Sequence, residues 1–182
     1  IEFNPLPDVG VFTSANTTKR GGDRPLKDLS RLANGSGAKY KIAVVHASLN
    51  IPGLSIDPHE PLIDLEEIVS SPFDYIAMGH WHRRQFWPQK GSPRAFYCGP
   101  PETLGFDDVP SPGSVTLVTL GLDTKVEEIS VGTFRWIKLS MDVNHVPDLN
   151  EVVRRISQEA GPNAFLRLEL KGDLSHDTKG HS

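Results

Sequence analysis

The 182-residue sequence contains one cysteine, Cys98, so it can form neither an internal disulfide nor a Cys-x-x-Cys thiolate metal site. It lacks any apolar run near the ~20 residues that cross a bilayer, and no charged leader precedes an apolar core. A basic excess is also missing: 19 Lys and Arg stand against 23 Asp and Glu, a net charge of −4. This balance excludes a uniformly basic nucleic-acid coat, although it allows a local basic groove. We expect a globular, cytoplasmic protein with no membrane segment.

What the sequence does contain is an α/β pattern in its first half. Two nearly continuous apolar runs, residues 40–45 and 74–79, are typical of strands that are covered on both faces of a sheet. Another short strand is expected at 8–12. Leucine and other apolar residues at helical spacing predict helices at 25–33 and 61–70.

From residue 94 onward the pattern changes to short strands. Apolar alternation predicts strands at 95–98, 114–120 and 126–131, the last two forming a hairpin. A β-α-β unit follows, with a strand at 133–141, a helix that Asp148 caps, and a strand at 165–170. We place a domain boundary before this unit, with a first domain at 1–131 and a second at 132–182.

Three of the seven histidines directly follow the two buried strands: His46 follows the first, and His80 and His82 follow the second. Ligand sites in α/β sheets collect at the carboxyl ends of strands. In an extended backbone, His80 and His82 would point to one face while Trp81 turns away. A helix between the two strands predicts that they lie side by side, so three imidazoles would converge as metal ligands. A His-x-His pair taken alone is more often an exposed loop or a satisfied core pair.

The stretches around these histidines resemble the calcineurin-like metallophosphoesterases, and among them the SbcD-type nuclease subunits of DNA break repair. The similar residues are Val44 to Leu49, Asp74 to Arg83 with its Gly-His-x-His, and Tyr97 to Glu102. Pro100 stands where SbcD-like members often carry Ser, which leaves the exact subfamily open. The resemblance implies half of a two-sheet αββα phosphoesterase domain, followed by a small α+β (β-α-β) cap.

The resemblance further implies a two-metal phosphodiesterase, with Mn²⁺ as the expected metal and Fe or Zn as alternatives. His46 and His80 would hold one ion and His82 the other. Two such ions lie roughly 3.5 to 4 Å apart and lower the pKa of a bridging water, which attacks phosphorus in line. Arg83 and Arg84, just beyond the ligands, are candidates for contacts to phosphate or DNA. A solvated surface pair is the alternative reading of these arginines. Trp81, Phe86 and Trp87 could stack on bases, but such residues more often fill a core.

The family's other metal motifs, Asp-x-His, Gly-Asp and Gly-Asn-His-Asp, are not found before residue 46. We therefore expect no catalytic residue in this span, because the catalytic His belongs to the last of these motifs. The chain also begins at Ile1 rather than Met, which predicts a processed product or a piece of a longer protein. With only three of the expected ligands, we expect it to be inactive by itself. Three look-alikes follow no suitable buried strand and are assigned to loops and a cap turn: Asp57-Pro58-His59, Gly22-Asp23 and Gly172-Asp173-Leu174.

The resemblance implies DNA as substrate, an SbcC-like ATPase as partner, and a homodimer in the whole protein. Two other functions remain open from the residues alone. One is a metallophosphoesterase that acts on a nucleotide or phosphoprotein, although the cap-like unit favours the nuclease. The other is a non-catalytic binding or scaffolding chain whose histidines are structural.

Overall fold

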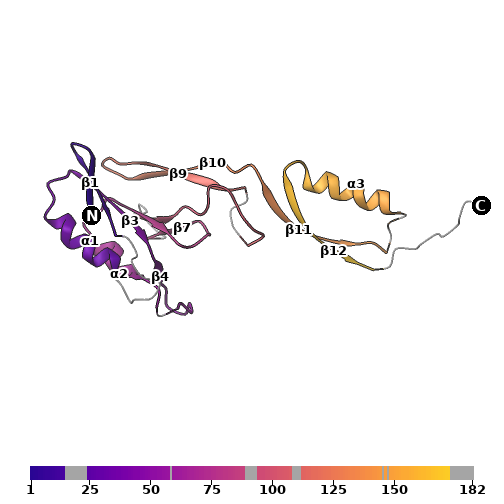
Figure 1. Ribbon diagram of the computed structural model, residues 1–182, viewed down its shortest axis with the longest axis horizontal. Helices are drawn as coiled ribbons and strands as arrows, with labels where there is room; N and C mark the ends of the chain where they lie inside the picture. The colour runs from indigo at the N-terminus through magenta and orange to yellow at the C-terminus, as the bar shows by residue number, and fades with distance from the viewer. Residues whose placement is uncertain are drawn as a thin grey trace, which may run out of the picture.

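The structure, a computed structural model, describes residues 1–14, 24–57, 59–88, 94–107, 112–144, 146 and 148–172. The first 131 residues contain a mixed α/β arrangement, shown at one end of the chain in Figure 1. Its elements are β1 (Glu2–Leu6), β2 (Val9–Thr13), α1 (Pro25–Asn34), β3 (Tyr40–His46), β4 (Ser48–Asn50), β5 (Leu62–Asp64), α2 (Leu65–Ser70), β6 (Tyr75–Gly79), β7 (Gln85–Trp87), β8 (Ala95–Tyr97), β9 (Ser114–Thr119) and β10 (Lys125–Ser130).

A six-stranded sheet in the order β1-β2-β3-β6-β8-β7 forms the centre of this part. Strands β2, β3, β6 and β8 are parallel, while β1 and β7 pair antiparallel at the two edges. The prediction that the strands before His46 and His80 lie side by side is confirmed, since β3 and β6 are neighbours in parallel. Their carboxyl ends therefore meet at the same edge of the sheet, as a site built from both strands requires.

Helix α1 covers the sheet because its apolar side chains fall on one face. Leu26 and Leu29 are buried against the strands, whereas Leu32 is about half exposed. Pro25 opens the helix, where its missing N–H costs no hydrogen bond. Helices α1 and α2 contact each other (Figure 1), and residues of both helices belong to the main hydrophobic cluster.

The helix expected at 61–70 begins later than the sequence predicted. Leu62–Asp64 is strand β5, which pairs in parallel with β4, and α2 starts only at Leu65. Asp64 and Glu67 form a capping box that fixes this start, with the Glu67 carboxylate accepting the Asp64 N–H at 2.9 Å. The sequence did not predict β1, β4 and β7 either. β4 and β7 have three residues each, too few to show a period, and β1 is an exposed edge strand that contains Pro5.

The predicted hairpin is confirmed as β9 paired antiparallel with β10. Two contacts attach it to the central sheet. The Thr124 hydroxyl donates to the Asp74 carbonyl at 3.4 Å, and Arg84 forms an ion pair with Glu128. The hairpin therefore borders the segment that follows His82.

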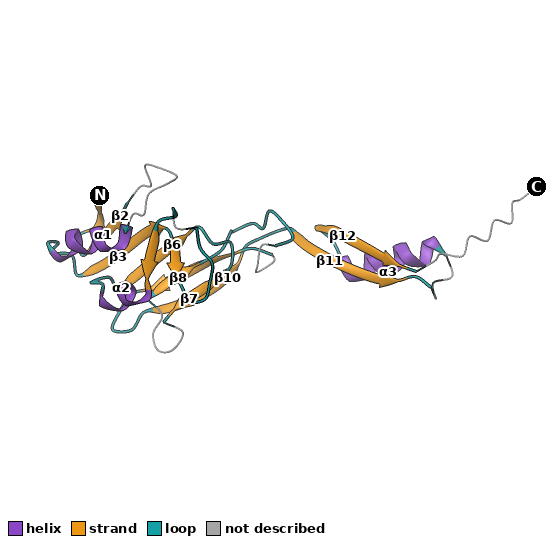
Figure 2. Cartoon of the chain, turned by 90° about the horizontal axis from the view of Figure 1, so that it is seen from below, coloured by secondary structure: helices purple, strands orange, loops and turns teal. Residues whose placement is uncertain are grey.

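The predicted β-α-β unit is also confirmed. It consists of β11 (Arg135–Asp142), α3 (Leu149–Ala160) and β12 (Ala164–Lys171), with the two strands parallel (Figure 2). Asp148 caps α3 by accepting the Glu151 N–H at 2.9 Å, and the helix ends at Gly161 with a φ of 64°, which favours glycine. Met141, Val143, Val146 and Val152 form a hydrophobic cluster separate from that of the sheet.

Glu102 joins the two parts of the chain through backbone hydrogen bonds. Its carboxylate accepts the N–H groups of Thr133 at 2.7 Å and Phe134 at 3.0 Å, and these bonds hold the pKa of the Glu102 carboxyl below its usual range. Nearby, the Trp136 indole N–H donates to the Thr103 carbonyl at 2.7 Å. The junction thus rests on bonds to the main chain.

The predicted α/β class is confirmed, whereas the full two-sheet αββα arrangement and the boundary at 131/132 stay predictions. Within the described ranges, no helix has the length and apolar character needed to cross a membrane.

Replacing Phe12 with Ala should destabilise the sheet. Phe12 is fully buried with its ring centroid 5.7 Å from that of Phe73, so the free energy of unfolding should fall by about 3 to 5 kcal/mol. Phe3→Ala is the matched control, because that side chain is 63% exposed and its loss should cost less than about 1 kcal/mol. Urea denaturation followed by circular dichroism measures both, and equal losses would contradict the assignment of the core.

Candidate functional site

The site begins where β3 and β6 end together. In the parallel register His46 lies opposite Gly79, and His80 directly follows Gly79 in the chain. The Nε2 atom of His46 lies 3.2 Å from Nδ1 of His80, and the two ring centroids are 5.0 Å apart. The structure therefore brings two of the three predicted ligands into direct contact.

Gly79 leaves room for this contact. A Cβ atom added at Gly79 would lie 3.2 Å from Nδ1 of His46, closer than most such contacts. His80 itself has a φ of 113°, a conformation that residues with a side chain rarely adopt. Strain of this kind costs on the order of 1 to 3 kcal/mol and is typical of functional sites. The expected extended backbone is thus wrong at His80, because the chain turns there directly after β6.

His82 is the third predicted ligand. It lines, together with His46 and His80, a cavity of about 170 Å³. However, no three His, Cys, Asp or Glu side chains among the described residues are grouped closely enough to hold a metal ion. The metal roles of all three histidines therefore stay predictions.

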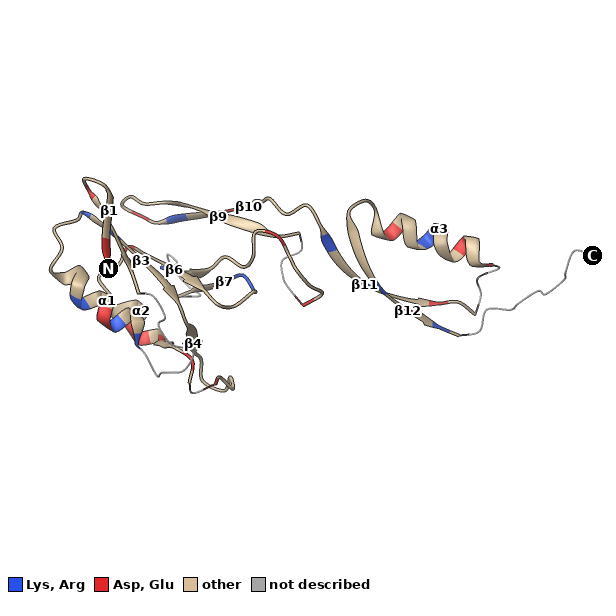
Figure 3. Ribbon diagram, viewed as in Figure 1, with Lys and Arg blue, Asp and Glu red and all other residues tan. Residues whose placement is uncertain are grey.

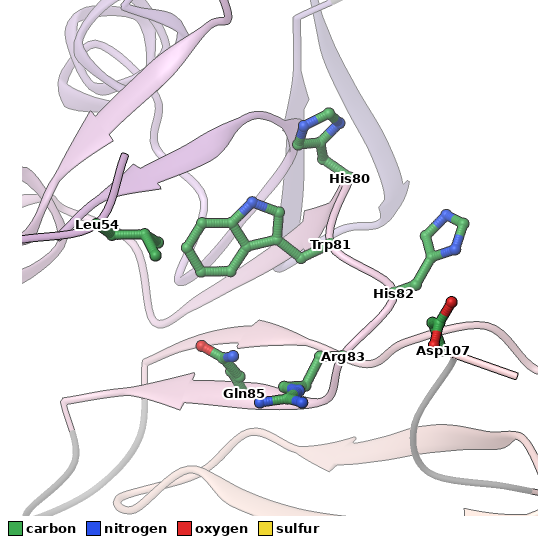
Figure 4. A pocket seen from close by; sticks show the side chains of 7 residues that line it. All are labelled: Leu54, His80, Trp81, His82, Arg83, Gln85 and Asp107. Carbon is green, nitrogen blue, oxygen red and sulfur yellow. The ribbon is translucent and has the colours of Figure 1, made fainter. Parts of the chain in front are cut away.

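A larger hollow of about 410 Å³ is also lined by residues of this segment. Figure 4 shows that Trp81 extends toward Leu54, away from the rings of His80 and His82, as the sequence predicted. The residues that line this hollow are Leu54, His80, Trp81, His82, Arg83, Gln85 and Asp107.

The two arginines differ in their surroundings. Arg83 lines the larger hollow and is exposed. Arg84 forms an ion pair with Glu128 on β10 and lies 5.8 Å from the centre of the Phe96 ring. The ion pair favours a structural role for Arg84, while the role of Arg83 as a phosphate contact stays a prediction.

Sequence reasoning missed Glu60 and Ser48, which reach the same site. The Glu60 carboxylate oxygen Oε2 lies 3.3 Å from Nε2 of His80 and accepts the Ser48 hydroxyl at 2.5 Å. Ser48 in turn accepts the Trp81 indole N–H at 3.2 Å. The position of Ser48, two residues after His46, could have drawn attention to it. Glu60 ends a loop rich in Pro and Gly and gave no periodic signal.

Aromatic packing supports the segment that carries His80 and His82. The Trp81 ring stacks on Tyr97 with centroids 4.9 Å apart, and Trp87 packs edge-on against Trp81. Burial raises the pKa of Tyr97, so its hydroxyl keeps the proton that it donates to the Ala47 carbonyl at 2.5 Å. Trp81 and Trp87 thus pack in or against the core, the alternative that the sequence favoured over stacking on bases.

Burial, followed by the charge of nearby His80, lowers the pKa of His46. Both causes favour the neutral imidazole, which is the form that binds metal ions. The His46–His80 pair is therefore better suited to binding a cation than to carrying a second proton on His46.

The sequence is similar to that of known proteins. The chain is 36% identical over 105 residues to the SbcD subunit of the nuclease SbcCD from Escherichia coli K12, and equally to that from Escherichia coli O157:H7. This confirms the resemblance to SbcD. The match covers 56% of this chain and 25% of each relative, so the matched stretch is about a quarter of the relatives' length. No protein-family profile matches the chain.

Of the look-alike motifs, only parts lie within the described residues. Asp57 accepts the His59 N–H at 2.9 Å within its own loop. Pro58, Gly22-Asp23 and Asp173-Leu174 lie outside the described residues.

The strain at His80 can be measured by comparing two substitutions. Both His80→Gly and His80→Ala remove the imidazole, but only glycine adopts a φ of 113° readily. We expect the Gly variant to be more stable than the Ala variant by about 1 kcal/mol in urea denaturation. At exposed Glu66 in α2 the order should reverse, because glycine weakens a helix. Equal stability of the two His80 variants would contradict a strained backbone.

Proposed function

We propose that this chain forms part of a two-metal phosphodiesterase, an SbcD-like DNA nuclease in which His46 and His80 share one ion and His82 binds the other. The observation that carries the proposal is the 3.2 Å separation of the His46 and His80 nitrogens at the ends of neighbouring parallel strands. The similarity to a component of a nuclease supports the same chemistry.

The donor atoms fit a metal ion. Two imidazole nitrogens bound to one ion at ordinary ligand distances lie about 3 to 3.5 Å apart. The observed distance of 3.2 Å falls in this range, and the low pKa of His46 keeps its ring available. Further ligands, carboxylates among them, would have to come from outside the described residues.

Each side chain has a separate task in this proposal. His46 and His80 would hold one cation, and His82, which lines the same cavity, would hold the second. When bound, two divalent ions of this kind lower the pKa of a water and offset phosphoryl charge. Arg83 would donate to a phosphate oxygen in the adjoining hollow and so orient the diester. Mn²⁺ is the proposed metal, with Fe or Zn as alternatives.

DNA is the proposed substrate, and the electrostatics favour local contacts over a broad basic surface. Figure 3 shows basic and acidic residues interspersed along α1 and α3. The exposed Arg83 lies beside the proposed metal ligands, where a phosphodiester would be cleaved. We further propose an SbcC-like ATPase as partner, because the relatives are named as one subunit of SbcCD. A homodimer and a cytoplasmic location are further parts of the proposal.

The substrate class can be tested on the complete polypeptide in which this sequence occurs. With Mn²⁺ present, we expect it to cleave linear duplex DNA, as seen by gel electrophoresis. His80→Ala should slow cleavage at least about tenfold, whereas His59→Ala, in an exposed loop, should leave the rate unchanged. Absence of DNA cleavage together with fast turnover of a small phosphodiester would instead favour a nucleotide or phosphoprotein substrate.

By itself, the 182-residue chain should bind Mn²⁺ weakly and cleave no DNA. Its candidate ligands are three imidazoles without a grouped carboxylate among the described residues, and Mn²⁺ prefers oxygen donors. Isothermal titration calorimetry measures the binding. Tight binding of two Mn²⁺ ions per chain would contradict this prediction and show that the chain holds a complete centre.

A further inference from the structure

Two hydrogen bonds connect Trp81, Ser48 and Glu60, and the Glu60 carboxylate in turn contacts His80; chemistry fixes the direction of the two bonds. The indole N–H can only donate, so Ser48 accepts from Trp81 at 3.2 Å. An ionised carboxylate can only accept, so Ser48 passes its own proton toward Glu60 at 2.5 Å. The same Glu60 oxygen lies 3.3 Å from Nε2 of His80.

This direction determines where His80 carries its proton. An ionised Glu60 carboxylate accepts but cannot donate, so its oxygen, 3.3 Å away, favours a proton on Nε2 of His80 and leaves a lone pair on Nδ1 in the neutral ring. Nδ1 is the atom that lies 3.2 Å from Nε2 of His46. In the metal-free chain, His46 can donate a proton to this lone pair, and a cation can take that proton's place.

Glu60 is held in position by the local fold. The Ser48 N–H donates to the Pro61 carbonyl at 2.9 Å, directly beside the β4–β5 pairing. Ser48 is 1% exposed, so its hydroxyl has few alternative partners. The β4–β5 pairing thus holds Glu60, which directly precedes Pro61, beside the imidazole of His80, the residue that follows β6.

We propose that Glu60 is a positioning residue that fixes the tautomer and orientation of His80, so that Nδ1 faces the ion shared with His46. The inference rests on the proposed metal site, but its structural half, the tautomer, can be measured without any metal. Carboxylates that hold the second nitrogen of a ligating histidine tune metal sites in this way, and their loss typically costs about 10- to 100-fold in affinity.

The test uses nitrogen-15 NMR of the imidazole rings in the metal-free chain, at a pH above the ordinary imidazole pKa. We expect His80 to populate the Nε2–H tautomer in the unmodified chain and a mixture of tautomers in Glu60→Ala. Glu60→Gln should retain the Nε2–H form, because the amide oxygen still accepts a hydrogen bond. Glu66→Ala, which removes an exposed carboxylate on α2, is the matched control and should change nothing.

Zn²⁺ titration supplies the second measurement, since imidazole binds Zn²⁺ more tightly than Mn²⁺. Affinity should fall about 10- to 100-fold in Glu60→Ala and stay unchanged in Glu66→Ala. An unaltered tautomer in Glu60→Ala would overturn the inference, and so would loss of the Nε2–H form in Glu60→Gln, because an acceptor oxygen would then be insufficient.

The two proposals fail in different ways. If the complete polypeptide binds no Zn²⁺ while Glu60→Ala in the chain still shifts the tautomer, the metal site is wrong and the positioning role stands. If the chain binds Zn²⁺ and Glu60→Ala changes neither measurement, the metal site stands and the positioning role is wrong.

Discussion

The parallel pairing of β3 with β6 is the constraint on which the site depends. It sets His46 opposite Gly79 and leaves His80 at the first position beyond the ladder. A shift of one residue would send these side chains to the opposite face of the sheet, because alternate residues point to opposite sides. The buried residues oppose such a shift, since Ala43 and Val45 would leave the core if β3 moved, and Ile76 and Met78 would leave it if β6 moved.

His80 combines a strained backbone with a side chain that two neighbours hold in place. Its backbone is held in a conformation that favours glycine, while its ring is held from two sides by His46 and Glu60. The neighbouring Trp81 is anchored by Tyr97 and Ser48, so the residues around the ring have little freedom to rearrange. Such packing keeps a strained residue in place, because relaxing it would break several contacts at once.

The sequence predicted the elements whose patterns are long enough to read. The apolar runs of β3 and β6, the amphipathic α1 and the β-α-β unit all appear where periodicity placed them. It failed where a few residues or distant contacts decide the structure. The turn at His80 is set by a single φ angle, and the approach of Glu60 to His80 joins residues 20 apart in the sequence. Local patterns contain neither kind of information, so the predicted histidines were found without the groups that orient them.

The junction at Glu102 limits how this chain can vary in evolution. Its carboxylate binds the amide groups of Thr133 and Phe134 and touches neither of their side chains in these bonds. Most replacements of Thr133 or Phe134 keep the backbone N–H and therefore its hydrogen bond to Glu102. Proline is the residue type that removes this N–H. Position 102 tolerates fewer replacements, because shortening the side chain by one carbon would withdraw both carboxylate oxygens from the two N–H groups. Selection on the junction between the two hydrophobic clusters should thus act on the Glu102 side chain and on the absence of proline at positions 133 and 134.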